Sequence, residues 1–131
     1  MANANRSTHP INTPKSEVVL LTAKLTGGGA AADMVNAESA NQGGGEVSSC
    51  VYNSATGKFA VTFRHTYPSL LCAPVVTVVG TTDGLHGMFS AIDITAGTAV
   101  LELYVGNTAT DPATTDTIYF MWAVRNSGRN A

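Results

Sequence analysis

Short segments in which apolar and polar residues alternate recur along most of this chain, and turn-forming residues separate them. Alternation with a period of two is typical of β-strands, whereas helical periodicity is nearly absent. The alternating segments span residues 17–25, 47–53, 58–64, 74–80, 88–95, 98–105 and 117–126. About seven or eight short strands of this kind predict an all-β fold, an antiparallel β-sandwich with a jelly-roll-like topology.

The alternation also predicts which side chains face the core. Phe59, Val61 and Phe63 share one face of their segment. In the last segment the inward side chains are expected to be Ile118, Phe120, Trp122 and Val124. Two sheets packed face to face would bury these aromatic rows together.

Two segments are more apolar than a half-buried strand requires. Segment 17–25 is apolar on both faces, so we expect both faces to be covered. The β-branched run Val75, Val76, Val78 and Val79 belongs in the interior of a sheet, and Pro74 at its start is tolerated there.

Glycine marks the predicted turns. Residues 54–57 and 96–97 connect hairpins, and Gly57 is expected to take a positive φ. Residues 27–45, GGGAAADMVNAESANQGGG, form a long glycine-rich excursion with room for one helical turn near residues 33–40.

The first sixteen residues differ from the rest. They contain Pro10 and Pro14 and almost no hydrophobic periodicity, so residues 1–16 are expected to be an extended N-terminal arm. Residues 17–131 then form a single sandwich domain, because 131 residues leave no room for a second one. The arm lacks the apolar stretch of a signal peptide, and the chain has no run of about 18 apolar residues. We therefore expect cytoplasmic synthesis without export, and no membrane span.

Charge is sparse. Charged residues make up 12% of the chain and the formal net charge is -2, so much of the surface must be neutral, as suits a protein packed in an assembly. The seven lysines and arginines are scattered without a basic patch, and we expect no nucleic-acid partner.

Cysteine and histidine give no metal-binding pattern. Cys50 and Cys72 lie in strand-like segments, and in a reducing cytoplasm we expect two buried free thiols. His9, His65 and His86 are not spaced as metal ligands and are expected to be surface or hydrogen-bonded histidines.

No catalytic set is apparent. The serines at positions 48, 49 and 90 lack a glycine-framed nucleophile elbow. Asp111 and Asp116 share the loop GNTATDPATTD, where a calcium site is one interpretation and ordinary Asp-Pro turn chemistry the other. We expect no catalytic, cofactor-binding or metal-binding residues and no enzymatic activity.

Two stretches carry a resemblance. Residues 57–80, GKFAVTFRHTYPSLLCAPVVTVVG, and residues 106–127, GNTATDPATTDTIYFMWAVRNS, resemble small virion proteins of tailed bacteriophages, in particular head decoration or cement proteins. The shared features are a strand that follows a glycine, the pair Tyr67 and Pro68, the valine strand, the Thr-Asp-Pro loop and the closing strand. The resemblance covers roughly residues 46–127 and leaves out the arm and the glycine-rich excursion.

This resemblance implies a β-sandwich that assembles, often as a trimer, on the outer surface of a capsid and binds the major capsid protein. The virion surface would then be its location, after synthesis in the host cytoplasm. We expect the arm to make the main contact with a sister subunit or the capsid, because such arms gain order on a partner's sheet edge or groove. The candidate contact residues are Arg6, His9 and Ile11.

Two other functions remain open at this stage. A carbohydrate- or receptor-binding module of a phage tail or neck would need an exposed aromatic platform, for which Tyr104 and Tyr119 are the candidates. An enzyme would need several titratable groups that converge in a pocket.

Overall fold

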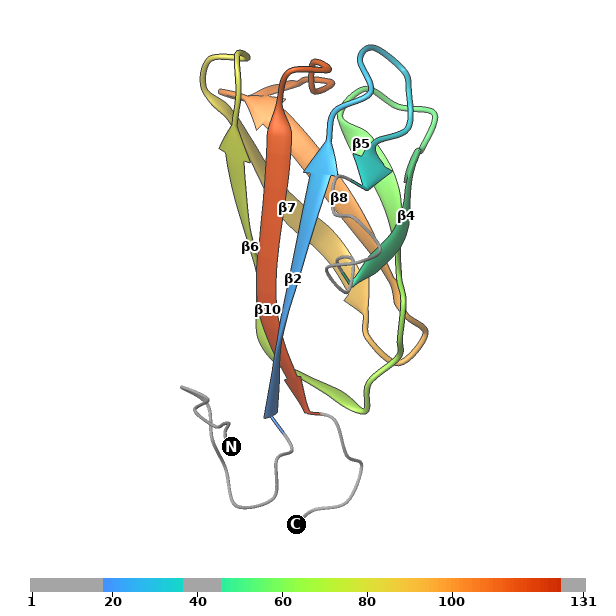
Figure 1. Ribbon diagram of the computed structural model, residues 1–131. Helices are drawn as coiled ribbons and strands as arrows, with labels where there is room; N and C mark the ends of the chain where they lie inside the picture. Colours follow the sequence, from blue (N-terminus) through green and yellow to red (C-terminus); the bar gives the residue numbers. More distant parts are fainter. Residues whose placement is uncertain (1–17, 37–45, 126–131) are drawn as a thin grey trace.

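The computed structural model describes residues 18–36 and 46–125, which form two antiparallel sheets that face each other. The predicted all-β antiparallel sandwich is thereby confirmed. Residues 1–17, which include the predicted arm, lie outside the described residues. Figure 1 shows the two layers, with β2, β10 and β6 side by side in one of them.

The first sheet has the order β3-β2-β10-β6, and the second has the order β4-β5-β8-β7, with β9 paired to β8. The strands of the described residues are β2 (Val18–Thr26), β3 (Val35–Asn36), β4 (Val47–Tyr52), β5 (Lys58–Phe63), β6 (Ser69–Val79), β7 (Leu85–Asp93), β8 (Thr98–Val105), β9 (Thr108–Ala109) and β10 (Thr117–Arg125).

The chain crosses repeatedly between the sheets. Among the described strands the first long one, β2, pairs with the last, β10, over the full length of both, from Thr26 opposite Thr117 to Val18 opposite Arg125. Strand β10 pairs on its other side with β6, and in the second sheet β5 pairs with β8. This pairing of early with late strands is jelly-roll-like. A bridge between Met34 and Cys50 joins the two sheets along the β3 and β4 edges.

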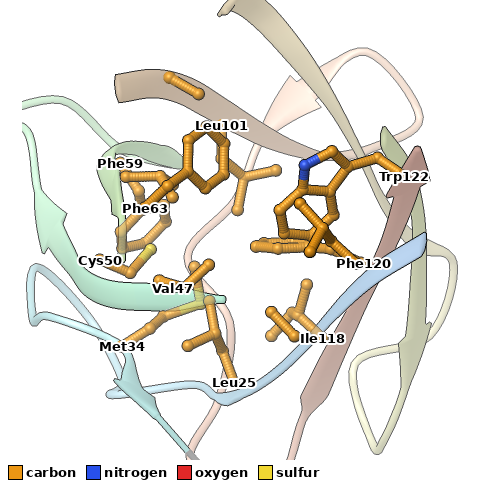
Figure 2. Close-up of a cluster of buried hydrophobic side chains, with 14 of the residues drawn as sticks. Leu25, Met34, Val47, Cys50, Phe59, Phe63, Leu101, Ile118, Phe120 and Trp122 are labelled. Carbon is orange, nitrogen blue, oxygen red and sulfur yellow. The ribbon is translucent and has the colours of Figure 1, made fainter. Parts of the chain in front are cut away.

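The predicted inner rows meet between the sheets (Figure 2). All seven side chains predicted to face inward on β5 and β10 are buried, and Trp122 packs on Phe63 with ring centroids 5.2 Å apart. The rings of Phe120 and Phe89 pack edge to face, with centroids 5.1 Å apart. Burying one such side chain contributes roughly 2 to 3 kcal/mol, so these rows hold the two layers together.

Three sequence expectations about the two most apolar segments are wrong. In the described part of the chain no element packs on the outer face of β2, where Leu20 is 52% exposed. The valine run does not lie in a sheet interior: β6 is an edge strand, and Val75 and Val79 are 55% and 60% exposed. Strand β6 also begins at Ser69, before Pro74, with register shifts opposite the end of β10.

The glycine-rich excursion contains an ordered part. Residues Met34 to Asn36 pair with neighbouring strands rather than forming the suggested helical turn, and residues 37–45 lie outside the described residues. A Cβ on Gly27 would stand 2.2 Å from the Ala113 carbonyl oxygen, so the chain packs too closely there for any side chain. The predicted positive φ of Gly57 is confirmed, at 72°.

Candidate protein-interaction surface

The outward side chains of β2, β10 and β6 form a weakly charged surface on which exposed apolar side chains lie among threonines, here called the apolar sheet face. Strand register aligns them in neighbouring rows: Leu20 with Ala123 and Cys72, then Thr22 with Met121 and Val75, then Lys24 with Tyr119 and Thr77, and at the end Thr26 with Thr117 and Val79. Leu20, Val75, Val79, Met121 and Tyr119 are 40% to 60% exposed. Exposed apolar residues are ordinary when scattered, but contiguous patches commonly mark interaction sites.

Charge is nearly absent from this surface. Its outward residues include two cations, Lys24 and Arg125, and no carboxylate. The Lys24 ammonium nitrogen lies 5.9 Å from the centre of the Tyr119 ring, so its charge is directed over an aromatic face. The surface therefore presents methyl, thioether and aromatic groups together with threonine hydroxyls, and its cations are Lys24 and Arg125.

The outer face of the second sheet is chemically different. Glu102 accepts a hydrogen bond of 2.5 Å from the Tyr104 hydroxyl. Hydrogen bonds from Ser90 and Tyr104 lower the pKa of Glu102, and the charge of Lys58 acts in the same direction. Met88, at 54% exposure, is the large apolar side chain on this face that most resembles Met121.

A shallow hollow of about 270 Å³ lies over β5, β8 and β7, lined mainly by small side chains such as Ala60, Thr62, Ala91 and Val100. Its titratable member, Asp93, accepts hydrogen bonds from the Thr95 hydroxyl and the Ala96 N–H. Through these hydrogen bonds the Asp93 carboxylate holds the turn between β7 and β8.

Asp111 and Asp116 are both occupied in holding loops. Asp111 accepts hydrogen bonds from the Gly57 N–H at 2.6 Å and the Ala31 N–H at 2.9 Å. Asp116 is fully buried and accepts from the N–H groups of Thr81, Thr82 and Ala113 and from the Thr82 hydroxyl. Burial opposes ionisation of Asp116, but the bonds from Thr82, Ala113 and Thr81 outweigh it and lower its pKa. Turn chemistry thus accounts for both carboxylates.

A second cluster lies where β5 leads toward β6. Glu46 accepts hydrogen bonds from the Tyr67 hydroxyl at 3.1 Å and pairs with His65 Nδ1 at 2.8 Å. Burial, together with the charge and hydrogen bond of Glu46, raises the pKa of Tyr67 to about 12. His86 Nδ1 lies 3.1 Å from the Gly84 carbonyl oxygen. Both described histidines are therefore hydrogen-bonded, as predicted, and His9 lies outside the described residues.

The prediction of two buried free thiols is confirmed only in part. Both are free, and Cys50 is buried with a pKa that desolvation and the charge of Asp33 raise to about 12. Cys72, expected to be buried, is exposed instead, because β6 is an edge strand and Cys72 lies opposite Ala123 on the apolar sheet face.

Tyr104 and Tyr119 do not form one aromatic platform. Tyr104 projects from β8 on the outer face of one sheet, and Tyr119 projects from β10 on the outer face of the other. The candidate contact residues Arg6, His9 and Ile11 lie outside the described residues.

Sequence reasoning missed the apolar sheet face. The signal was present in two segments that are apolar on both faces: residues 17–25, which were interpreted as covered on both faces, and the valine run, which was placed in the interior of a sheet. Within residues 18–36 and 46–125, no group of three or more His, Cys, Asp and Glu residues is placed to hold a metal ion. No helix in that part of the chain is long and apolar enough to cross a membrane.

Comparison of the chain with protein-family models, with curated proteins and with solved structures finds no match.

Proposed function

We propose that this protein is a non-enzymatic structural protein of a bacteriophage virion, a decoration or cement protein that binds and stabilises the outer surface of the head. Its partners in this proposal are the major capsid protein and further copies of itself. The observation that supports the proposal is the apolar sheet face, where large apolar side chains of the described two-sheet sandwich are exposed.

The chemistry of the described residues favours binding over catalysis. Asp116 and Asp111 hold loops through hydrogen bonds, and Glu46 binds His65 and Tyr67. These titratable groups therefore stabilise the fold. Large exposed side chains gather instead on β2, β10 and β6. Such a division of polar and apolar groups suits a protein that contacts macromolecular surfaces.

The virion setting comes from the resemblance of residues 57–80 and 106–127 to head decoration proteins. A weakly charged chain also suits dense packing on a capsid, where strong like charges on neighbouring copies would repel each other. We propose that residues 1–16 add a second contact, with Arg6, His9 and Ile11 as anchors on the capsid or a sister subunit.

Co-sedimentation with purified heads of the phage that encodes the chain tests this function. We expect saturable binding with a dissociation constant at or below about 1 μM, and heads that resist heat better when decorated. A chain that stays in the supernatant at roughly ten times that concentration would contradict the proposal. A variant without residues 1–16 tests the arm, and undiminished binding would remove the arm from the mechanism.

A further inference from the structure

We infer that a second copy of this chain packs on the apolar sheet face, so that the β2-β10-β6 layers of two copies lie face to face. The inference rests on the proposed function in one respect, that the protein acts as an assembling structural protein. The inference goes beyond the proposed function by naming the surface and the geometry through which copies associate.

The composition of the face favours a copy of this chain over a different protein. The buried core of an interface is depleted in charge, and interfaces between identical subunits are more apolar than interfaces between proteins that also exist apart. Its central row is Thr22, Met121 and Val75, without a charged group. A partner of opposite charge has no large field to recognise here, whereas an identical apolar face is complementary to it.

The area fits a pair of such faces. Strands β2 and β10 have nine residues each. Three strands about 4.8 Å apart, with a rise of about 3.3 Å per residue, present a plane on the order of 400 Å². Side chains project from this plane, so two faces in contact remove roughly 1,000 Å² from water, which is the lower limit for a specific interface.

The positions of the cations permit the pairing. Lys24 lies one row from the central row on β2, and Arg125 lies two rows from it, in the opposite direction, on β10. A two-fold axis perpendicular to β10, through the row of Thr22, Met121 and Val75, places each strand over the same strand of the other copy with its direction reversed. Each Lys24 then faces Leu20 of the other copy and each Arg125 faces Thr117, so the cations stay apart.

Sedimentation velocity of the full chain over a range of concentrations tests the inference, with one variant on each outer face. Met121→Lys places a charge in the centre of the apolar sheet face, and Met88→Lys places the same charge on the other sheet at similar exposure, 54% against 48%. We expect a monomer–dimer equilibrium for wild type and Met88→Lys, and a dissociation constant raised about tenfold or more for Met121→Lys. Equal weakening by both variants, a monomeric wild type, or a trimer as the assembled species would overturn the inference.

Cys72 supplies a second readout within the same face. Its thiol is exposed whereas Cys50 is buried, so a maleimide should modify Cys72 first. We expect the modification to slow in wild type as protein concentration rises and to stay constant in Met121→Lys. A rate independent of concentration in both proteins would contradict face-to-face packing.

These measurements separate the two proposals. Dimers that do not bind phage heads would leave the interface standing and refute the head-binding function. Binding to heads by a monomeric chain, unchanged in Met121→Lys, would refute the interface and leave the proposed function standing.

Discussion

The two ends of the sandwich are held together in different ways. At one end the fully buried Asp116 carboxylate accepts four hydrogen bonds, three of them from backbone N–H groups. At the other end Glu46, whose side chain is 12% exposed, accepts from Tyr67 and pairs with His65, which is 67% exposed. The first carboxylate thus binds mainly backbone donors, whereas the second binds side chains, one of which is largely exposed to water.

This difference indicates which end of the domain should be the more ordered one. Buried backbone donors must be satisfied, so the loops that meet at Asp116 cannot move without losing several bonds at once. Side-chain bonds at the Glu46 end exchange more easily with water. The described chain enters β2 at Val18 and leaves β10 at Arg125, at the end of these strands remote from Asp116 (Figure 1). Adjustment on binding is therefore expected away from Asp116.

The sharpest test of this difference removes the buried carboxylate. Asp116→Ala leaves the N–H groups of Thr81, Thr82 and Ala113 without their acceptor, so we expect the free energy of unfolding to fall by about 4 kcal/mol. Chemical denaturation measures it. Asp83→Ala is the matched control, because Asp83 is exposed in the adjacent turn, and it should change stability by less than about 0.5 kcal/mol. Similar losses in the two variants would show that Asp116 does not organise this end.

Acid extends the same test. The pKa of Asp116 is lower in the folded chain than in the unfolded chain, so its stabilising contribution is complete above the unfolded value of about 4. It is lost as the pH falls through the folded pKa. We expect the difference in unfolding free energy between wild type and Asp116→Ala to shrink below about pH 4. A difference that stays constant to lower pH would mean that the ionised form is not what the loops require.

Asp111 should give a smaller effect at the same end. Its carboxylate joins the turn before β5 to the loop after β2 through the N–H groups of Gly57 and Ala31. It is partly exposed, and water can replace it as an acceptor, so we expect Asp111→Ala to lower the unfolding free energy by about 1 to 2 kcal/mol. Hydrogen exchange at Gly57 should rise more than in β10. A loss as large as that of Asp116→Ala would contradict this ranking.

How much of the fold can be predicted from the sequence depends on how far apart along the chain the interacting residues lie. The inward rows of β5 and β10 follow from local alternation, which needs no knowledge of strand order. The edge position of β6 depends on its pairing with β10, whose paired residues lie 38 to 56 positions further along the chain, and no local pattern specifies it. For that reason Val75, Val79 and Cys72 were expected in the interior and are found on an exposed face.

The carboxylates show the same limit. Asp116 and its donors Thr81 and Thr82 are 35 and 34 residues apart, and Glu46 is 21 residues from Tyr67. The residue types predict turn chemistry for an Asp-Pro loop, but they do not predict which backbone groups it will bind. The apolar sheet face was hidden for a related reason, since a strand with two apolar faces reads the same whether a neighbour in the same chain or another molecule covers it.

At the Glu46 end, Tyr67→Phe should have a moderate effect. It removes a hydrogen bond to a carboxylate while keeping the ring, so we expect a loss of about 1 to 2 kcal/mol near neutral pH. The folded pKa of Tyr67, about 12, is above the unfolded value of about 10, so the neutral phenol stabilises the fold below pH 10. That contribution is lost as the pH rises from about 10 to 12. Stability curves of wild type and variant that stay parallel across this range would contradict the role of the phenol.

The smallest effect is expected for His65→Ala, and it is the test most able to break the contrast between the ends. His65 lies 2.8 Å from Glu46, yet its side chain is 67% exposed, so water screens the pair and replaces the lost bond. We expect a change below about 0.5 kcal/mol, and in a double-mutant cycle with Tyr67→Phe a coupling energy of similar size. The prediction is demanding because both side chains meet the same carboxylate oxygen, Oε2 of Glu46. A coupling energy well above 1 kcal/mol would show that the three side chains act as one network, and that this end is as firmly tied as the one around Asp116.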